Sequence, residues 1–488
     1  MKSKYALLLT ITVLSLAGLS FGVLLQSEGV GASALQQPQR TYTANADFAE
    51  GTLVGLEYAT VPNQLQVAVE SGVLPFIWVP NSNEGTISKV DTSTGKELGR
   101  YRTAPSSTTP NPSRTTVDLQ GNCWVGNRQT ATAVKVGLLE SGQCVDRNTN
   151  GTIETSRDLN NDGNIQGTEL LAWGQDECVL TEVVLIAGQE RNYVPGSFAG
   201  SYANDYWNPG PRGIAIDASG NVWVGTYGTK KYYYINGATG QIMRTIDVSS
   251  ANHTPYGAVI DRNGILWSSG YDDNAANADL LRLNPADNSF LATNLGHQVY
   301  GIGLDRNNHL FVSAYHQQKL SRVNVLTGQK EWTRDGTGDD YQARGIAVTS
   351  DGDVWVANTG SGKVTRWSND GVKKTAIAVG NSPTGVAVDA AGKVWVVNNG
   401  DDYIKRIDPA TNTVDLEKHI LGTTHYGYSD MTGFVSRTVT TRTGTWTVVY
   451  DSQTANAPWG VISWNSAEPA GTSIRARARS SANQTTWS

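Results

Sequence analysis

The residues best suited to chemistry in this chain form an oxygen-rich stretch in its first half. Residues 158–169 read D-x-N-x-D-G-x5-E, with acidic or amide side chains at alternate positions and a glycine at the sixth. Calcium binds six to eight hard oxygen ligands, and this spacing brings such ligands together while the glycine allows a sharp turn. The stretch therefore predicts a Ca²⁺ site. Its expected ligand residues are Asp158, Asn160, Asp162, Asn164 and Glu169.

A similar loop comes directly before it. Its expected ligand residues are Asp146, Asn148, Asn150 and Thr152. The twelfth position holds Arg157 in place of a glutamate, so a second Ca²⁺ would need a carboxylate from elsewhere, and Asp158 is the nearest candidate. Little helix is expected on either side, so the pair resembles dockerin or thrombospondin-type calcium loops more than full EF-hands. The alternative is an Asn/Gly-rich hairpin whose acids are solvated.

Two of the three cysteines flank these loops. Cys144 and Cys178 stand at the two ends of the stretch, and a disulfide between them would close its base in an oxidising compartment. Cys123 would then remain as a small buried thiol beside Trp124. Three cysteines allow three pairings, of which we expect Cys144–Cys178.

A second set of reactive side chains recurs at matching places along the chain. An arginine or a tyrosine recurs near the start of one predicted strand. A tyrosine or an asparagine recurs at the end of the strand that comes after it. Guanidinium groups bind carboxylates with two parallel hydrogen bonds, and aromatic rings stack on sugars and peptides. A polar, aromatic binding rim is one interpretation; strand caps that fill a channel mouth are the other. The expected ligand-binding residues are Arg114, Arg212, Tyr227, Tyr256, Tyr271, Tyr300, Tyr315, Arg344, Asn358 and Asn398.

The elements that would position these residues come from an internal repeat. Five clear copies begin at residues 211, 255, 299, 343 and 383, and two weaker ones are anchored at Trp78 and Trp124. The period is about 44 residues, as in propeller blades. Each copy reads as a buried strand, an Asp-x-x-Gly turn and a returning strand with a large aromatic residue. We predict an all-β fold, a seven-bladed β-propeller with a small C-terminal β-module.

These copies share the pattern P/x-x-G-[IV]-x-[IVL]-D-x-x-G-x-[LV]-[WF], which resembles NHL-repeat and virginiamycin B lyase-like (streptogramin lyase-like) propellers. The resemblance covers residues 211–420 well and 64–210 loosely. In the lyase family, histidines just ahead of the innermost strands and a glutamate act around Mg²⁺. Here the matching positions hold no histidine, so the catalytic set cannot be carried over. They are Arg212, Tyr256, Tyr300, Arg344 and Thr384. His253, His297 and His316 remain a weaker candidate rim cluster, since a solvated loop histidine is the commoner case.

The domain boundaries follow from composition. Residues 1–34 are typical of a secretory signal, with Lys2 and Lys4 before an apolar run and Ala32-Ser33-Ala34 as the cleavage site; an uncleaved membrane anchor is the alternative. Residues 35–50 are expected as a flexible lead-in and residues 51–427 as the propeller, interrupted at 144–178. Leu53–Ala59 is the expected strand that closes the ring against the last blade. Residues 428–488 are expected as a β-strand module that is incomplete.

The charge and the motifs of the chain limit the classes of function to consider. A formal net charge of −6 without a basic run argues against nucleic acid as a partner. We expect an exported protein, secreted, periplasmic or at the cell surface, with no membrane insertion after signal cleavage. We predict a calcium-binding scaffold for an extracellular polysaccharide, peptide or protein. The alternative is a streptogramin lyase-like or lactonase-like enzyme with its site at the channel mouth; the missing histidines favour the scaffold.

Overall fold

The computed structural model of the 488-residue chain describes residues 6–14, 22–26, 39–54, 56–59, 61–67, 74–271, 279–440, 443–453, 457, 460–466, 468 and 473–481. The chain divides into two compact units. One is continuous and spans residues 74–440. The other combines residues 1–73 with residues 441–488, so both ends of the chain contribute to it.

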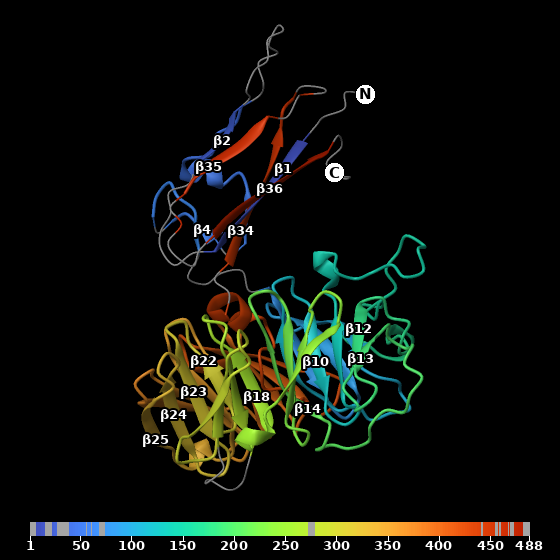
Figure 1. Cartoon of the computed structure of the whole chain (residues 1–488), viewed down its shortest axis with the longest axis vertical. Coiled ribbons are helices and arrows are strands. Elements are labelled where there is room, and N and C mark those ends of the chain that lie inside the picture. Colours follow the sequence, from blue (N-terminus) through green and yellow to red (C-terminus); the bar gives the residue numbers. More distant parts are fainter. Residues whose placement is uncertain are drawn as a thin grey trace. The chain divides into compact units, whose positions relative to one another are not determined.

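Within the described part of residues 74–440, seven antiparallel sheets form the blades of a β-propeller (Figure 1). Blade 1 has the strands β6 (Phe76–Asn81), β7 (Thr86–Asp91) and β8 (Glu97–Arg102). Blade 2 has β9 (Pro112–Val117), β10 (Cys123–Asn127), β11 (Thr132–Val136), β12 (Val179–Val184) and β13 (Arg191–Tyr193).

The other five blades have four strands each. Blade 3 has β14 (Pro211–Ile216), β15 (Val222–Thr226), β16 (Lys231–Ile235) and β17 (Ile242–Asp247). Blade 4 has β18 (Pro255–Ile260), β19 (Leu266–Gly270), β20 (Asp279–Leu283) and β21 (Phe290–Asn294). Blade 5 has β22 (Ile302–Leu304), β23 (His309–Ala314), β24 (Lys319–Asn324) and β25 (Lys330–Asp335).

Blade 6 has β26 (Ala343–Val348), β27 (Val354–Asn358), β28 (Lys363–Trp367) and β29 (Lys373–Ala378). Blade 7 has β30 (Pro383–Val388), β31 (Val394–Asn398), β32 (Tyr403–Asp408) and β33 (Thr413–His419). Short helical turns interrupt the loops. They are η1 (Leu139–Ser141), η2 (Gly167–Glu169), η3 (Ser249–Ala251), η4 (Gly338–Asp340) and the π-helix η5 (Ser436–Thr440).

The repeated motif explains why each copy folds alike. The Asp389 carboxylate accepts hydrogen bonds from the backbone N–H groups of Ala391 and Lys393, which fixes the turn, and its other oxygen accepts from the indole of Trp395 at 2.8 Å. The indole packs against Ile77 and Val79 of blade 1, so it lies between neighbouring blades as the sequence predicted. The prediction of a seven-bladed, all-β propeller is confirmed.

Blade 1 is completed by the far end of the propeller sequence. The backbone N–H of Trp78 donates to Met431 O at 2.9 Å, and that of Ser82 donates to Thr424 O at 3.0 Å, so residues 424–431 take the place beside β6 that an innermost strand takes in other blades. The expectation that Leu53–Ala59 closes the ring is wrong. Within that stretch β3 (Thr52–Val54) pairs with β34 (Thr443–Asp451) instead, because both belong to the second unit.

The second unit is built from strands of both chain ends. Its larger sheet has the order β3, β34, β1 (Ala6–Leu14), β36 (Ser473–Ser481). Two smaller sheets pair β2 (Gly22–Gln26) with β35 (Val461–Asn465), and β4 (Leu56–Glu57) with β5 (Gln66–Val67). A short helix α1 (Asn45–Phe48) lies in the stretch expected as a lead-in, and there Tyr42 and Phe48 are buried against Trp446.

The N-terminal apolar run is described only in part. The expected cleavage site Ala32-Ser33-Ala34 lies outside the described residues. The segments of the run that are described, β1 and β2, are strands. Among the helices of the described residues, none is long and apolar enough to cross a membrane.

Candidate functional site

The arginines and tyrosines predicted as a binding rim meet at one end of the propeller channel. Arg114, Arg212, Tyr256 and Arg344 lie on innermost strands, near the strand starts. Tyr227, Tyr271 and Tyr315 directly follow second strands and pack around Tyr256 and Tyr300. We call the full set the mouth cluster. It comprises Arg114, Arg128, Arg212, Arg344, Tyr206, Trp207, Tyr227, Tyr256, Tyr271, Tyr300, Tyr315, Tyr426 and Tyr428.

The four guanidinium groups of the mouth cluster are packed on aromatic rings. Arg114 lies 3.4 Å from the ring centroid of Tyr428, Arg128 lies 4.2 Å from that of Tyr426, and Arg344 lies 4.9 Å from those of Tyr315 and Tyr426. The faces of aromatic rings carry partial negative charge, which stabilises cations placed over them. Such contacts hold a guanidinium in position without neutralising it.

These four arginines differ from those of the outer strands. Arg100, Arg322, Arg366 and Arg406 each form an ion pair with Asp or Glu. Among the described residues, no carboxylate forms an ion pair with any arginine of the mouth cluster. Arg114, Arg128 and Arg212 are nonetheless at most 3 % exposed. Buried cations without counter-ions are costly, so this arrangement favours an anion.

Several of their N–H groups also have no acceptor. Arg114 donates through Nη1 to Tyr428 O at 2.8 Å, but its Nε and Nη2 are buried without a hydrogen-bond partner. Arg344 donates through Nη2 to the Tyr315 hydroxyl at 3.2 Å, and its Nε and Nη1 are likewise unpartnered. Carboxylate and phosphate oxygens are the acceptors that fit such paired donors.

Four phenol groups converge between the guanidiniums. The Tyr256 hydroxyl lies 2.9 Å from that of Tyr300 and 2.8 Å from that of Tyr428. Tyr426 joins them through contacts of 3.3 Å to Tyr300 and Tyr428. Burial by itself would raise the pKa of Tyr426, but the Arg344 and Arg128 guanidiniums oppose it and hold this pKa well below the ordinary value. Tyr426 is thus the one internal group that can supply negative charge among these phenols.

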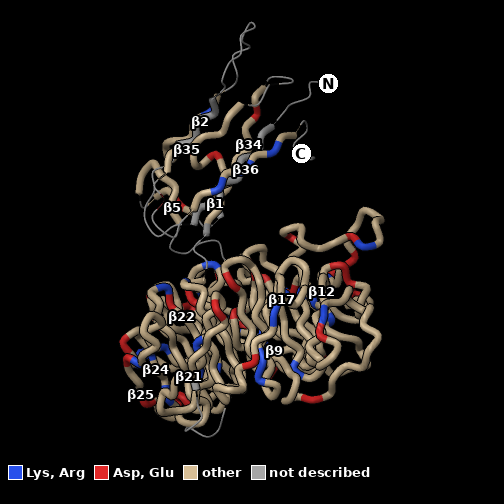
Figure 2. Tube along the Cα trace, in the orientation of Figure 1, with Lys and Arg blue, Asp and Glu red and all other residues tan. Residues whose placement is uncertain are grey.

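Two of the guanidiniums, those of Arg128 and Arg212, are close enough to affect each other. Burial and then the nearby charge of Arg212 lower the pKa of Arg128. The chain as a whole has a formal net charge of −6, and along the rest of the propeller Lys and Arg are interspersed with Asp and Glu (Figure 2). The mouth cluster differs from these regions because, among the described residues, none of its four arginines forms an ion pair with a carboxylate.

Sequence reasoning missed five members of the cluster, including Arg128, which directly follows a second strand as Tyr227 does. Arg128 follows β10, Tyr206 and Trp207 lie in the long connection from β13 to β14, and Tyr426 and Tyr428 follow the last blade. The backbone places Trp207, since its carbonyl and that of Asn208 both accept from Gly228 N. A usable signal was present, because the connection between blades 2 and 3 is aromatic and far longer than a blade turn.

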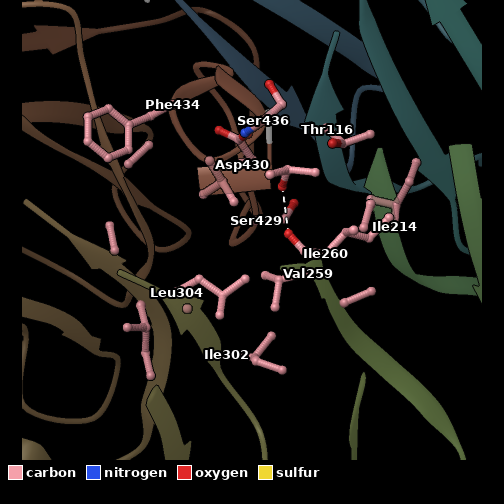
Figure 3. A pocket seen from close by; sticks show the side chains of 18 of the residues that line it. Thr116, Ile214, Val259, Ile260, Ile302, Leu304, Ser429, Asp430, Phe434 and Ser436 are labelled. Atoms are coloured by element: carbon pink, nitrogen blue, oxygen red, sulfur yellow. Dashed lines mark hydrogen bonds between the residues drawn. The ribbon is translucent and has the colours of Figure 1, made fainter. Parts of the chain in front are cut away.

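Below the mouth cluster the channel is nearly filled. Figure 3 shows aliphatic side chains of the innermost strands, such as Ile214, Ile260 and Leu304, facing Asp430 and Phe434. The cavity between them holds about 40 Å³, enough for a few waters and too small for a sugar or a peptide segment. A ligand would therefore bind at the mouth.

Asn358 and Asn398 lie inside the blades. The Asn358 amide donates to Val356 O and to Thr365, and that of Asn398 donates to Val379 O and Asp401. Both side chains are fully buried. They act here as caps of strand ends, which is the role that the sequence left open as an alternative.

The histidines near the mouth are held by serines. His253 Nε2 lies 2.7 Å from the Ser268 hydroxyl, and His297 Nε2 lies 2.6 Å from that of Ser321. Burial lowers the pKa of both imidazoles, to about 3 for His253. His316 is exposed. Two of the three candidate histidines therefore pair with hydroxyls between strands and stay neutral near pH 7.

The oxygen-rich loops lie between β11 and β12, and Cys144 and Cys178 form a disulfide at their base, as predicted. In the second loop Asp158 accepts from Gly163 N at 3.1 Å, and Glu169 accepts from Leu159 N at 2.9 Å and Asn160 N at 3.2 Å. The glutamate thus turns back onto the start of its own loop, and Gly163 takes a φ of 83°.

The first loop folds in the same way but is closed by Glu177. Asp146 accepts from Gly151 N at 2.8 Å, just as Asp158 does from Gly163 N. The Glu177 carboxylate accepts from Arg147 N at 2.8 Å and Asn148 N at 3.4 Å, which matches the bonds of Glu169. The sequence had suggested Asp158 as the carboxylate that completes the first loop. The disulfide explains the difference, because it brings residue 177 beside residue 145.

Some features of these loops fit a bound cation and others do not. Among the described residues, no group of three His, Cys, Asp or Glu side chains is arranged to hold a metal ion, and the Lys96 ammonium lies 3.0 Å from Asp158 Oδ2. Asn and backbone oxygens make up the rest of such loops. Asp158 Oδ1 is buried without a hydrogen-bond partner, so one oxygen there lacks a donor or cation.

Comparisons with known proteins concern the fold. No protein-family profile and no curated protein sequence matches the chain. Virginiamycin B lyase from Staphylococcus aureus is 15 % identical, covering 71 % of this chain and 97 % of that one, with a TM-score of 0.47. A streptogramin B lyase is 13 % identical over 77 % and 94 %, with a TM-score of 0.47. A functionally unknown protein from Desulfotomaculum acetoxidans is 13 % identical over 73 % and 98 %, with a TM-score of 0.50. The last of these likenesses supports the propeller fold, and identities this low carry no function.

Proposed function

We propose that this protein is an exported binding scaffold whose mouth cluster receives an anionic group of a polysaccharide, peptide or protein. The observation that carries this proposal is the set of four guanidiniums without carboxylate partners among the described residues. Their rings and phenols hold them in place, so an arriving carboxylate meets donors that are already oriented. Export is supported by the N-terminal sequence and by the disulfide, which is typical of oxidising compartments.

The proposal includes calcium at the inserted loops. Asp158, Asn160, Asp162, Asn164 and Glu169 would hold one ion. Asp146, Asn148, Asn150, Thr152 and Glu177 would hold a second. The support is the calcium-loop spacing, the parallel turns of the two loops and the unpartnered Asp158 Oδ1. The role of calcium would be to stiffen the insertion, while the anionic ligand binds at the mouth.

The scaffold hypothesis can be tested with simple polyanions. Polygalacturonate, poly-L-glutamate and neutral dextran are titrated into the protein at low and at high ionic strength. At least one acidic polymer should bind in a salt-sensitive manner, and dextran should not. The double variant Arg114→Gln/Arg344→Gln should lose this binding, whereas Arg334→Gln on outer strand β25 should retain it. Failure of every acidic polymer to bind would contradict the proposal.

The enzyme hypothesis relied on histidines at the rim. His253 and His297 are instead bonded to serines within the blades. We therefore favour binding over histidine-based catalysis at this site.

A further inference from the structure

The mouth cluster combines two recognition elements, of which a simple anion site would need only the first. One is the set of unpartnered guanidinium donors. The other is Trp207, whose side chain is 47 % exposed although it belongs to an ordered aromatic group. Its ring lies 5.4 Å from that of Tyr227 and is nearly parallel to that of Tyr271. An exposed indole held beside a cation fits a ligand that offers both an apolar ring face and an acidic group.

The cation next to this face is Arg212. Its guanidinium lies 4.6 Å from the Trp207 ring and 5.6 Å from that of Tyr256, and its Nη2 donates to Tyr206 O at 2.9 Å. Arg212 Nε is buried without a hydrogen-bond partner. Arg212 and Trp207 are thus fixed against each other, with an unused donor on the first and an indole that remains partly exposed on the second.

We propose that the ligand is a uronic acid residue of an acidic polysaccharide, with its sugar ring stacked on Trp207 and its carboxylate bound by the guanidiniums of the mouth cluster. This inference rests on the proposed function and names the ligand class for that site. The apolar face of a pyranose ring stacks on an indole, and its carboxylate is the paired acceptor that arginines prefer. The phenols of Tyr256, Tyr300 and Tyr428 are at most 4 % exposed and bond to one another, so they hold the cluster together and do not contact the sugar.

An acidic peptide fits the same charges less well. Peptides that bind without a groove usually add a strand to a sheet edge or anchor apolar side chains in pockets. The innermost strands face a channel with about 40 Å³ of free space, so no peptide segment can lie along them. The mouth cluster offers guanidiniums and one indole, and these groups recognise carboxylates and ring faces.

The net charge adds a further constraint. With a formal net charge of −6, the chain as a whole provides no net attraction for a polyanion. Affinity should therefore depend on one or a few uronate residues bound at the mouth cluster and not on the length of the polymer. Short oligomers should bind nearly as tightly, per site, as long ones.

The test uses one pair of ligands that differs in charge and one pair that differs in backbone. Hexagalacturonate, its methyl-esterified form and hexaglutamate are titrated into the full chain by calorimetry. Hexagalacturonate should bind, and the ester, which keeps the ring but loses the carboxylate charge, should bind at least tenfold more weakly. Trp207→Ala should weaken hexagalacturonate binding at least tenfold, with no change in the melting curve. Trp464→Ala, an exposed tryptophan on β35, is the matched control and should have no effect.

The other outcomes separate the two proposals. If hexaglutamate binds more tightly than hexagalacturonate, or if Trp207→Ala leaves hexagalacturonate binding unchanged, the uronate inference is overturned while the anion-binding scaffold stands. If Trp207→Ala lowers the melting temperature, Trp207→Tyr, which keeps a ring, should restore hexagalacturonate binding. Failure of that rescue overturns the inference. If none of the acids binds, both proposals fall.

Discussion

At the scale of single residues, side chains at the repeated positions of this propeller form hydrogen bonds inside the blades. These bonds matter as much as the contacts that the side chains make at the surface or in the channel. The Asp261 carboxylate fixes its turn through Asn263 N and Ile265 N and also accepts from the Trp267 indole at 2.9 Å. In blade 6 the same place is taken by Thr349, whose hydroxyl accepts from Trp355. An oxygen therefore reaches the indole in blades 4, 6 and 7, and either a carboxylate or a hydroxyl can provide it, whereas the Trp124 and Trp223 indoles of blades 2 and 3 have no hydrogen-bond partner within the described part of the chain.

His253 offers a test of the structural role of the rim histidines. Burial, and to a lesser extent the charge of Lys230, lowers its pKa to about 3. An unfolded histidine titrates near pH 6.5, so below that pH the unfolded state binds a proton that the folded state does not. The stabilising effect of neutral His253 is therefore complete above about pH 6.5 and is lost as the pH falls towards about 3.

The variant His253→Gln removes this titration and retains a polar group for Ser268. Between pH 7 and pH 4.5 its free energy of unfolding should fall less than that of the wild type, by ~2 kcal/mol. Denaturant unfolding at the two pH values measures the difference, with the exposed His316→Gln as control. An equal loss of stability in wild type and His253→Gln would show that this histidine is not held neutral.

At the scale of elements, the insertion between β11 and β12 shows how a covalent link can determine which groups meet. The spacing of Asp158–Glu169 identified the second loop from sequence alone, because all its oxygens lie in one contiguous stretch. The carboxylate that closes the first loop could not be predicted from such spacing. Glu177 reaches Arg147 N only because the adjacent disulfide folds the end of the insertion back onto its start. A contact made across a loop leaves no periodic signal.

Calcium titration distinguishes the two loops. Wild-type protein should bind two Ca²⁺, whereas Glu169→Gln and Glu177→Gln should each bind one, since each removes the bidentate carboxylate of one loop. Calcium at a hundredfold excess over the dissociation constant should raise the stability by ~2–3 kcal/mol for each bound ion, and a chelator should reverse this. Glu190→Gln, outside both loops, is the control. The absence of any binding heat or melting shift would contradict the calcium proposal.

Removing the disulfide should affect both stability and the first loop. The bond spans 34 residues, and the double variant Cys144→Ser/Cys178→Ser should lose ~3–4 kcal/mol of unfolding free energy. It should also lose calcium at the first loop, because Glu177 is no longer held near Asp146, and keep calcium at the second. Cys123→Ala, at the buried free thiol, should leave both calcium sites intact. Retention of both sites in the double variant would argue against Glu177 as a ligand.

At the scale of the whole molecule, the sequence predicts what repeats and misses what does not. The period identified seven blades, and aligned positions within it identified Arg114, Arg212 and Tyr256 at the mouth. Trp207 lies in a connection outside the period, and Tyr426 reaches blade 1 from the far end of the propeller sequence, so no alignment of local copies placed them. Ring closure by residues 424–431 and the pairing of β3 with β34 join segments hundreds of residues apart, and such pairings leave no trace in local spacing.

The second unit provides the last prediction, because its core is shared by both chain ends. Phe48 is fully buried, its ring lies edge-on to Trp446 at 5.8 Å, and its carbonyl accepts from the Trp446 indole at 3.0 Å. Phe48→Ala removes this contact and should cost ~3–5 kcal/mol in that core. Trp223 has the corresponding place in a core shared by blades 3 and 4. Since the two cores share no buried residue, calorimetry should show two transitions. Phe48→Ala should lower one of them and Trp223→Ala the other, and a single transition shifted by both variants would show that residues 39–67 and 443–481 do not fold as a unit of their own.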